Sequence, residues 1–358
     1  MPAVQHDRLR AVVAEICRRA GGTADDAAVV ADHLVLSNLF GHDSHGIGML
    51  PRYVEAIAAG KLDPHAHAEV VKDDGAILVV DGRRGFGQVV AREAILHGIE
   101  RARSTGVVLL ALRNAFHIGR IGTYGELCAD AGMISVHFVN VIGHRPLVAP
   151  FGGADARFAT NPFCCALPAV EGKPPIILDF ATSMVAMGKV RVAFNSGQSV
   201  AEGLLIDHAG RPTTDPAAMF DEDVGAIRAM GLHKGSGLAV ICELLAGVLT
   251  GGGTIQPETP RDDSVVNNML TFIIEPSSLV TADYLRHEIA AMVDYVKASP
   301  PADPTLPVLI AGEPERISSE ARRRTGIPVD ETTWEQILAA GESVGLTRGT
   351  MLADAGLA

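Results

Sequence analysis

Clusters of positive charge are missing from this chain of 358 residues. It contains 30 Lys and Arg against 42 Asp and Glu, a net charge of −12, and no group of four or more neighbouring basic residues. Basic clusters supply the attraction to phosphate backbones and anionic membranes, so we expect neither a nucleic-acid nor a membrane partner. The run Arg322-Arg323-Arg324 is more typical of a solvated helix face than of a nucleic-acid patch.

Long apolar runs and paired cysteines are missing as well. The longest apolar stretch, Leu238 to Leu249, contains Glu243 and at about 12 residues falls short of the ~20 that cross a bilayer. The first twenty residues are charged and amphipathic, unlike a secretory signal, so we expect a cytoplasmic protein. The five cysteines include the adjacent pair Cys164-Cys165 and show no CxxC spacing, which favours neither a disulfide framework nor a zinc site.

A standard Rossmann dinucleotide site is also not indicated. No GxGxxG follows an early strand, and the Gly-rich stretch at 82–87 is spaced differently and fits a turn. The composition, 47% apolar and 20% charged, is that of a globular protein. Its length exceeds that of most single cores, so we expect two or three packed subdomains.

Helical and strand periods alternate along the chain, which predicts an α/β or mixed architecture. Two helices are expected within 5–39, the second starting near 23–26, and others at 51–58, 88–105, 124–131, 184–190, 234–250 and 281–298, with two more at the C-terminus. Strands are expected at 76–81, 107–112, 134–139, 176–180, 269–274 and 306–310. Residues 146–175 are rich in Pro and Gly and should be looped, and 196–216 should form an irregular hairpin.

Two histidines in small-residue surroundings mark the candidate site. His45 belongs to His-Asp-Ser-His-Gly at 42–46, and His117 to Asn-Ala-Phe-His-Ile-Gly at 114–119. Imidazole exchanges protons near neutral pH, and Gly and Ser let a ligand approach the backbone closely. The pattern predicts acid–base chemistry on a small molecule. A strand-helix-strand unit would place His117 and Asn140 on loops at strand ends.

Two segments could bind an anion at the start of a helix. In Asp179 to Ser183 an acidic residue ends a strand and small hydroxyl residues follow, a pattern that suits phosphate and ribose but equally an ordinary helix cap. The segment His233 to Gly237 follows the same logic and adds a positive charge. His65 and His67 could chelate a metal but have no further ligand at suitable spacing, so we expect loop histidines. Structural roles are expected for His33, His97, His137 and His208.

Six segments, in order, closely resemble the type-2 malate/L-lactate dehydrogenase family over about residues 5 to 355, and most of all its bacterial hydroxycarboxylate dehydrogenase B branch. They are 37–46, 117–125, 160–162, 179–183, 233–237 and 312–313. The resemblance implies a mixed-sheet, non-Rossmann α/β fold with a flanking helical subdomain, assembled as a homodimer. It implies an NAD(P)H-dependent oxidoreductase that interconverts 2-oxo and 2-hydroxy acids by hydride transfer. The alternative is a reductase of cyclic imines such as piperideine- or pyrroline-2-carboxylate.

We expect four parts. Residues 1–75 form a helical part that carries the His-Asp-Ser-His-Gly motif and packs with the C-terminal helices of 300–358. Residues 76–145 carry the second histidine, and residues 146–299 bind the cofactor.

By position, the resemblance makes His45 and His117 the candidates for proton donor and acceptor, with Ser44 orienting the substrate or the histidine and Tyr124 lining the pocket. The cofactor is expected to be NAD, with NADP as the alternative. The residues assigned to it are Asn140, Thr160, Asn161, Leu178, Asp179, Phe180, Ala181, Thr182, Ser183, Met184, His233, Lys234, Gly312, Glu313 and Pro314.

The chain departs from the family at Met49. Many members carry an arginine there, three residues after Ser-His-Gly, and methionine cannot make the bidentate contact to a substrate carboxylate. Either another arginine substitutes, Arg120 first and Arg52 or Arg145 behind it, or the pocket takes a bulkier, less polar 2-oxo acid.

Two rival functions belong to other classes. One is a metal-dependent hydrolase that uses Asp43, His45, His65 and His67. The other is a cofactor-binding protein without turnover. Neither rival explains the six ordered segments.

Overall fold

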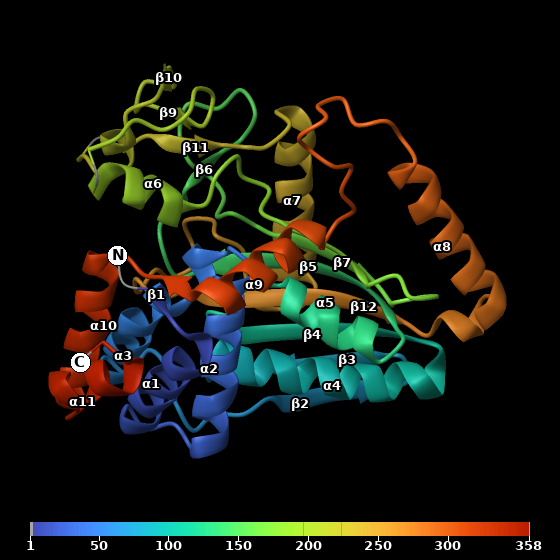
Figure 1. Cartoon of the computed structure of the whole chain (residues 1–358), viewed down its shortest axis with the longest axis horizontal. Helices are drawn as coiled ribbons and strands as arrows, with labels where there is room; N and C mark the ends of the chain where they lie inside the picture. The colour runs from blue at the N-terminus through green and yellow to red at the C-terminus, as the bar shows by residue number, and fades with distance from the viewer. Residues whose placement is uncertain (1–2, 196, 223, 358) are drawn as a thin grey trace.

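A seven-stranded mixed sheet forms the centre of the computed structural model, which describes residues 3–195, 197–222 and 224–357 (Figure 1). The strand order is β2-β3-β4-β12-β5-β7-β8, with β3 and β4 parallel and the other neighbours antiparallel. This confirms the expected mixed α/β class. The strands are β2 (Glu69–Asp74), β3 (Ile77–Asp81), β4 (Val107–Phe116), β5 (Ile134–Ile142), β7 (Phe163–Leu167), β8 (Ile176–Phe180) and β12 (Val266–Ile274).

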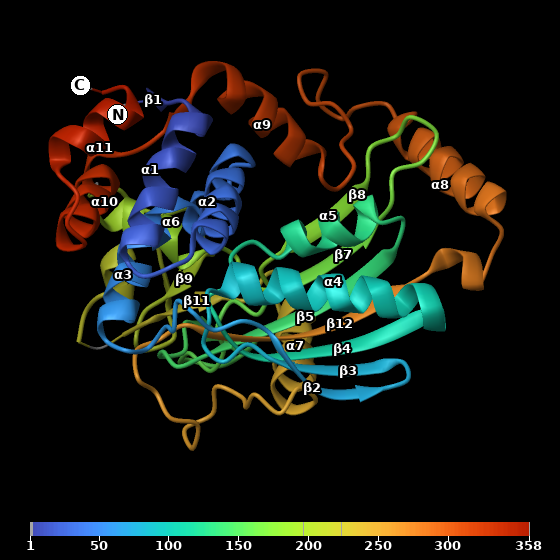
Figure 2. The same cartoon turned by 90° about the horizontal axis from the view of Figure 1, so that it is seen from below.

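Helices cover both faces of this sheet. Figure 2 shows α4 (Gly87–Thr105) and α5 (Gly122–Asp130) on one face and α7 (His233–Val248) on the other. Helix α4 is the crossover that parallel β3 and β4 require. It approaches the sheet closely because Gly98 has no side chain: a Cβ there would lie 2.8 Å from Ile273 Cδ1. The packing places the end of β4, and with it His117, at the edge of the buried core.

A separate core joins the two ends of the chain. Helices from both ends of the chain share it with the start of α4, and a short antiparallel pair of strands ties residues 3–4 to residues 327–328. Thr23 caps the second helix by accepting from Asp26 N at 3.1 Å, as its position before the helix predicts. The elements are β1 (Ala3–Val4), α1 (His6–Arg19), α2 (Ala24–Leu39), α3 (Leu50–Ala58), β13 (Ile327–Pro328), α10 (Glu331–Ser343) and α11 (Arg348–Ala355); α9 (Glu313–Thr325) runs along α2.

A smaller four-stranded sheet, in the order β10-β9-β11-β6, lies beside the main one with α6 (Met187–Asn195) against it (Figure 1). Its β9–β10 pair forms the hairpin that was expected within 196–216. Residue 196 of that range lies outside the described residues. Helix α8 (Ala282–Lys297) lies away from both sheets. The strands are β6 (Val148–Ala149), β9 (Leu205–Ile206), β10 (Pro212–Thr213) and β11 (Ala226–Arg228).

Several sequence predictions were wrong in detail. Residues 306–310 form no strand, because Pro304 and Pro307 restrict a segment that lacks a pairing partner. The stretch 146–175 contains β6 and β7, whose alternating burial was hidden among prolines and glycines. The helix expected at 184–190 begins at Met187 and continues to Asn195. The exposed strand β2 was not predicted. Asn140 lies inside β5 and not on a loop. Three helices, α9, α10 and α11, end the chain where two were expected. The other expected elements are confirmed to within a few residues.

None of the helices in the described ranges combines the length and apolar character needed to span a membrane.

Candidate active site

The His-Asp-Ser-His-Gly segment forms a tight turn, η1 (Asp43–His45), directly after α2. Asn38 at the end of α2 holds both sides of the turn: its Nδ2 donates to Asp43 Oδ1 at 2.6 Å and its Oδ1 accepts from Ile47 N at 2.9 Å. Gly46 is required here, because a Cβ would lie 2.2 Å from Asn38 Oδ1. The motif thus encodes a close backbone approach that fixes where His45 lies.

Helix α9 clamps the same turn from the other side. Arg322 donates to both oxygens of Asp43, at 2.6 and 3.0 Å, and to the carbonyl of Asn38. Glu315 lies 3.2 Å from Nε2 of His42. The first His and the Asp of the motif therefore anchor the turn, and the following Ser44 and His45 are left to face the site.

The structure brings His45 and His117 together. His45 Nδ1 lies 3.2 Å from His117 Nε2, and the rings are stacked at 5.4 Å with 7° between their planes. On the far side of His117, Nδ1 lies 2.6 Å from the hydroxyl of Tyr53, and that hydroxyl accepts from Gln88 Nε2 at 2.6 Å. The result is a continuous chain of hydrogen bonds, Gln88–Tyr53–His117–His45.

Tyr53 and Gln88 were not found from the sequence. Tyr53 lies on α3 and Gln88 at the start of α4, and each is 1% exposed. The signal that could have found Gln88 is the Gly-Gln pair, because Gly87 lets α4 begin directly on the His117 backbone: a Cβ at Gly87 would lie 2.3 Å from the His117 carbonyl oxygen.

Positive surroundings and burial make both imidazoles poor bases in the free protein. Burial, reinforced by His42 and Arg120, lowers the pKa of His45 from 6.5 to about 4. Burial lowers the pKa of His117 well below its usual value, with His45, His33, Arg52 and His144 adding to the effect. The two imidazoles should therefore be neutral at pH 7, and a bound anion would raise their proton affinity.

The arginine predicted first for the substrate carboxylate is already engaged. Arg120 is 2% exposed, lies 3.0 Å from Glu126 and 3.8 Å from Asp179, and stacks over the Phe40 ring at 4.6 Å. Arg52 is less constrained: it is half-buried on α3, beside Tyr53, and donates to the carbonyl of Asp263 at 3.2 Å.

The other predicted substrate residues have supporting positions. Tyr124 is fully buried and donates to the carbonyl of Ile118, so it braces the His117 loop from behind. Ser44 lies against α6, where a Cβ on Gly188 would be 3.0 Å from Ser44 Cβ. Met49 packs on the helical core. Arg145 is exposed and donates to the carbonyl of Met219 at 2.6 Å.

The residues of the hydrolase alternative do not converge. Asp43 is paired with Arg322, His67 lies 2.7 Å from Glu93, and His65 is exposed. Across residues 3–195, 197–222 and 224–357, no group of three or more His, Cys, Asp or Glu side chains could hold a metal ion.

Backbone hydrogen bonds join the segments assigned to the cofactor. Thr182 N donates to the Thr160 carbonyl at 2.9 Å, and Met230 N donates to the Thr182 carbonyl at 2.9 Å, just before His233 and Lys234. At the other end of this region, Ile177 N donates to the Ala311 carbonyl at 3.2 Å, which brings Gly312 to Pro314 beside β8.

A buried carboxylate orients two of the predicted cofactor residues. Glu243 of α7 accepts from Asn140 Nδ2 at 2.9 Å and from Asn161 Nδ2 at 2.8 Å. Oδ1 of Asn161 is buried without a hydrogen-bond partner, and its backbone has the unusual φ of 30°. A buried acceptor of this kind suits the carboxamide N–H of a nicotinamide, so the residues present fit such a cofactor.

The carboxylate of Asp179 is engaged within the protein. Its Oδ2 accepts from Gly122 N at 2.7 Å, and Arg120 lies nearby. Burial raises the pKa of Asp179, although Arg120 and the Gly122 N–H oppose the shift. The neighbours Leu178 and Met184 have exposed side chains, whereas Glu313 is paired with Lys297 at 2.6 Å.

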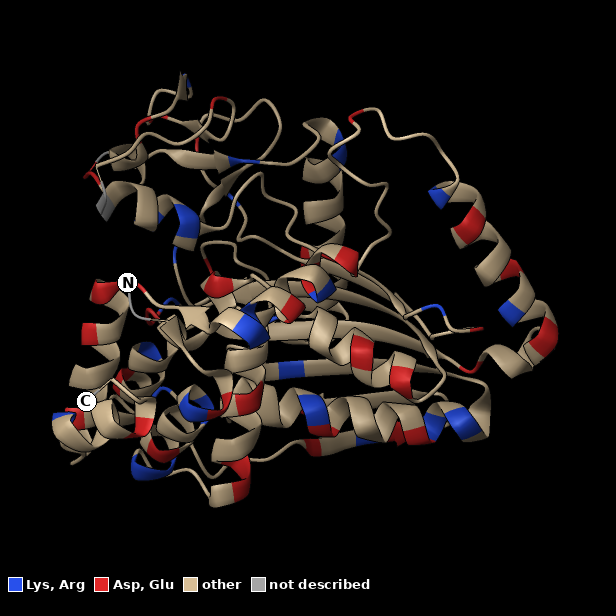
Figure 3. Cartoon of the chain, in the orientation of Figure 1, with Lys and Arg blue, Asp and Glu red and all other residues tan. Residues whose placement is uncertain are grey.

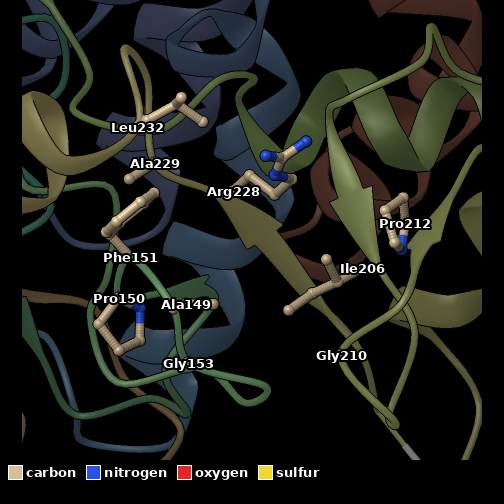
Figure 4. A pocket seen from close by; sticks show the side chains of 11 residues that line it. Ala149, Pro150, Phe151, Gly153, Ile206, Gly210, Pro212, Arg228, Ala229 and Leu232 are labelled. Carbon is tan, nitrogen blue, oxygen red and sulfur yellow. The ribbon is translucent and has the colours of Figure 1, made fainter.

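A groove of about 290 Å³ lies next to the start of α7, not at the imidazole pair. Figure 4 shows Phe151 and Leu232 on one side, Ile206 and Pro212 on the other, and Arg228 between them. His233 meets the Phe151 ring edge-on at 5.8 Å. The groove thus borders two residues assigned to the cofactor, His233 and Lys234.

Known proteins share this fold and sequence. The family model for malate/L-lactate dehydrogenase matches residues 4–338. Hydroxycarboxylate dehydrogenase B of Escherichia coli is 44% identical over 347 residues, which cover 96% of this chain and 95% of that protein. Sulfolactate dehydrogenase of Methanocaldococcus jannaschii has a structure with a TM-score of 0.84 and 31% identity, covering 97% and 98% of the two chains. The Δ1-piperideine-2-carboxylate reductase of Pseudomonas syringae has a TM-score of 0.80 and 27% identity, covering 95% and 100%.

Taken together, the mixed-sheet fold and these matches define an oxidoreductase that acts on the CH–OH group of hydroxy acids. The chain belongs to the malate/L-lactate dehydrogenase family, as its six ordered segments predict.

Proposed function

We propose that this enzyme interconverts 2-oxo acids and 2-hydroxy acids with NAD(H) or NADP(H), using His45 as the residue that exchanges a proton with the substrate. The observation that carries the proposal is the imidazole pair. Three of its four ring nitrogens have hydrogen-bond partners, and in the described chain His45 Nε2 is the one without. This nitrogen is the point at which a reacting oxygen can be met.

The cofactor, when bound, supplies or accepts the hydride at the substrate's second carbon. In reduction, protonated His45 then gives its proton to the oxygen on that carbon, and in oxidation neutral His45 removes it. His117 supports His45 through the 3.2 Å contact. The buried chain behind the pair keeps water away from the inner face of the site.

For the substrate carboxylate we propose Arg52 in place of the arginine that Met49 replaces. Arg52 follows Met49 by three residues, close to one helical turn, and adds a positive charge beside His117. Arg120, already paired with Glu126, is proposed as a support for the site.

The cofactor is proposed to lie along the linked segments that end β8 and begin α7, with its nicotinamide near Asn140 and Asn161. We favour NAD over NADP on the resemblance to the hydroxycarboxylate dehydrogenase B branch. The buried orientation of Asp179 supplies no argument for either.

A homodimer is also proposed. Helix α7 is mostly tan in Figure 3, because Lys234 and Glu243 are its charged residues, and several of its apolar side chains are exposed. Among them, Leu244 and Val248 are 46% and 59% exposed. A second copy of the chain would cover these side chains. Light scattering of wild type and of Leu244→Asp tests it: the wild type should have twice the mass of a 37.5 kDa chain and the variant a lower mass.

A cyclic imine remains the second candidate substrate, because a structural neighbour is named Δ1-piperideine-2-carboxylate reductase. An imine nitrogen and a carbonyl oxygen would meet His45 in the same place. Reduction of an oxo acid needs a proton from His45. Reduction of an imine does not, since the imine nitrogen can already be protonated when the substrate binds.

One experiment separates these possibilities. Purified enzyme is mixed with NADH or NADPH and a panel of 2-oxo acids and cyclic imines, and loss of absorbance at the nicotinamide band is followed. We expect oxidation of NADH by at least one 2-oxo acid. Turnover with imines alone would shift the assignment to imine reduction, and no turnover with any pair would overturn the proposal.

A further inference from the structure

We propose that Gln88 is a positioning residue for proton exchange: the direction in which its amide faces Tyr53 determines whether His45 Nε2 can gain and lose a proton. The inference rests on the proposed role of His45. It concerns Gln88 and Tyr53 at the inner end of the hydrogen-bonded chain, which have no role in the proposed reaction so far.

Each link in the chain constrains the next. Tyr53 has one hydroxyl proton, and its oxygen lies 2.6 Å from both Gln88 Nε2 and His117 Nδ1. A neutral imidazole carries a proton on one nitrogen and accepts at the other. The chain can therefore run in either of two directions, and Gln88 is the member that can offer a donor or an acceptor.

In the first direction the Gln88 amide donates to Tyr53, as it is turned in this structure. Tyr53 then donates to His117 Nδ1, and His117 donates from Nε2 to His45 Nδ1. His45 is left with its proton on Nε2 and cannot accept one there from a hydroxy acid. Adding a second proton at His45 Nδ1 would set two N–H groups against each other across 3.2 Å.

In the second direction the amide is turned over, so that Gln88 Oε1 accepts from the Tyr53 hydroxyl. The Tyr53 oxygen accepts from His117 Nδ1, and His117 Nε2 accepts from His45 Nδ1. When His45 also holds a second proton, on Nε2, it can pass that proton to the oxygen of the reduced carbon. His45 is then left neutral with its proton on Nδ1, and no other proton in the hydrogen-bonded chain moves.

The second direction is the one in which His45 Nε2 can exchange a proton, and it requires the Gln88 amide to turn. As the amide lies in this structure, its Oε1 is buried with no hydrogen-bond partner. Turning the amide gives Oε1 the Tyr53 hydroxyl but puts the amide N–H group in the place without a partner, so burial alone does not choose the direction and the proton exchange at His45 does. Gln88 cannot drift away from this contact, because Gly87 lies directly on the His117 backbone.

Among the described residues, the ionisable groups that act on His45, His117 and Tyr53 include no carboxylate. These groups come from α1, α2, the turn before η1, α3 and the loops after β4 and β5. They are Cys17, His33, His42, Arg52, Arg120 and His144. A neutral amide therefore sets the direction of the chain.

The test begins with Gln88→Met, which keeps the volume but can neither donate nor accept. Tyr53 then has His117 as its remaining partner and is driven to donate to it, which is the unproductive direction. We expect kcat for reduction to fall about tenfold to a hundredfold, the effect of leaving one buried group unsatisfied in the productive state. The pH above which the rate of reduction declines should also move to a lower value. Binding of NADH, measured by its fluorescence, should stay within twofold of wild type.

The second variant adds Tyr53→Phe to Gln88→Met. Without the hydroxyl nothing imposes the unproductive direction, so the double variant should turn over severalfold faster than Gln88→Met. If the two residues merely filled space, their losses would add. An unchanged kcat in Gln88→Met, or a double variant slower than Gln88→Met, overturns the inference.

A spectroscopic readout does not depend on turnover. In protein with ¹⁵N-labelled histidine, the ring shifts report which nitrogen carries the proton. At pH 7 we expect His45 and His117 to be protonated on Nδ1 in the wild type and on Nε2 in Gln88→Met. Wild-type rings protonated on Nε2 would overturn the inference even if the protein were active. A wild type that oxidises no NADH would instead contradict the proposed function.

Discussion

The proposed reaction depends on one ring nitrogen, Nε2 of His45. His117 holds Nδ1 of this ring, and among the described residues Nε2 has no hydrogen-bond partner. The surrounding charges are positive, which suits an anionic substrate and disfavours an imidazolium ion before the substrate arrives. Activity and substrate binding should therefore be linked through the charge on this ring.

The first prediction concerns pH. Because the pKa of His45 in the free enzyme is lowered to about 4, the protonated fraction falls about tenfold for each pH unit above it. We expect kcat/KM for reduction to decline from pH 5 to pH 8, and kcat/KM for oxidation not to decline, in steady-state assays of both directions. In His45→Gln, the rate should fall about 10²–10⁴-fold, and the decline of kcat/KM with pH should disappear. The exposed His65, replaced in the same way, is the control; equal losses in both variants would contradict the assignment.

The second prediction compares two arginines. Arg52→Leu should raise KM for the 2-oxo acid about tenfold to a hundredfold, because a charge-assisted contact to the carboxylate is lost. Arg120→Leu should lower the melting temperature, because it leaves the half-buried Glu126 without its partner. Saturation kinetics and thermal unfolding of both variants measure the difference. The reverse pattern, with KM raised by Arg120→Leu and unchanged by Arg52→Leu, would return the carboxylate to Arg120.

Among individual residues, the sequence pointed to His45 and His117 as candidates, because imidazole exchanges protons near neutral pH and the surrounding Gly and Ser let a ligand approach closely. It could not identify Tyr53 or Gln88, which are single polar residues on mostly apolar helix faces. Their importance comes from a contact between α3 and α4 that no local pattern encodes.

Among the elements, the turn η1 shows how a short motif depends on its neighbours. Its backbone is held by Asn38 from α2 and by Arg322 from α9. The glycine that follows has no space for a side chain.

The third prediction tests this packing. Gly46→Ala should displace Asn38, since the new Cβ would lie 2.2 Å from its Oδ1, and should cost about 1–3 kcal/mol of stability along with most of the activity. Gly48→Ala is the matched control, because its Cβ would meet Thr333 at an ordinary 3.6 Å. Denaturant unfolding and kcat for both variants provide the measurement. If Gly46→Ala behaved like Gly48→Ala, the close approach would not be needed.

Long periodic elements could be predicted from the sequence, whereas the short strands could not. Helices α1, α2, α4, α7 and α8 follow apolar periods with recognisable starts. Strand β7, Phe163–Leu167, is too short and too near prolines to be recognised from the sequence. It is extended because it pairs with β5 and β8, which are distant in sequence or follow it.

At the scale of the whole molecule, burial of neutral histidines links stability to pH. Burial lowers the pKa of His33 and of His137 from 6.5 to about 3. His137 lies between the hydroxyl groups of Thr271 and Ser135, at 3.0 and 2.8 Å.

The fourth prediction follows from these values. The unfolded chain binds protons at these histidines below about pH 6.5, and the folded chain does so only near pH 3. Stability is thus fully present above pH 6.5 and is lost as pH falls from 6.5 towards 3. Denaturant unfolding at several pH values should show this decline. His137→Gln should reduce its slope by about 1.4 kcal/mol per pH unit, the effect of one proton. An unchanged slope would mean that His137 is charged in the folded state.

The clamp between Asp43 and Arg322 joins residues 279 positions apart. During synthesis at about 5–20 residues per second, the turn that carries His45 waits on the order of tens of seconds for Arg322 to be made. The helices at the start of the chain also share their core with the last helices. An enzyme stalled or cut before α9 would have both histidines, but the turn that carries His45 would be held by Asn38 alone and would lack the clamp from Arg322.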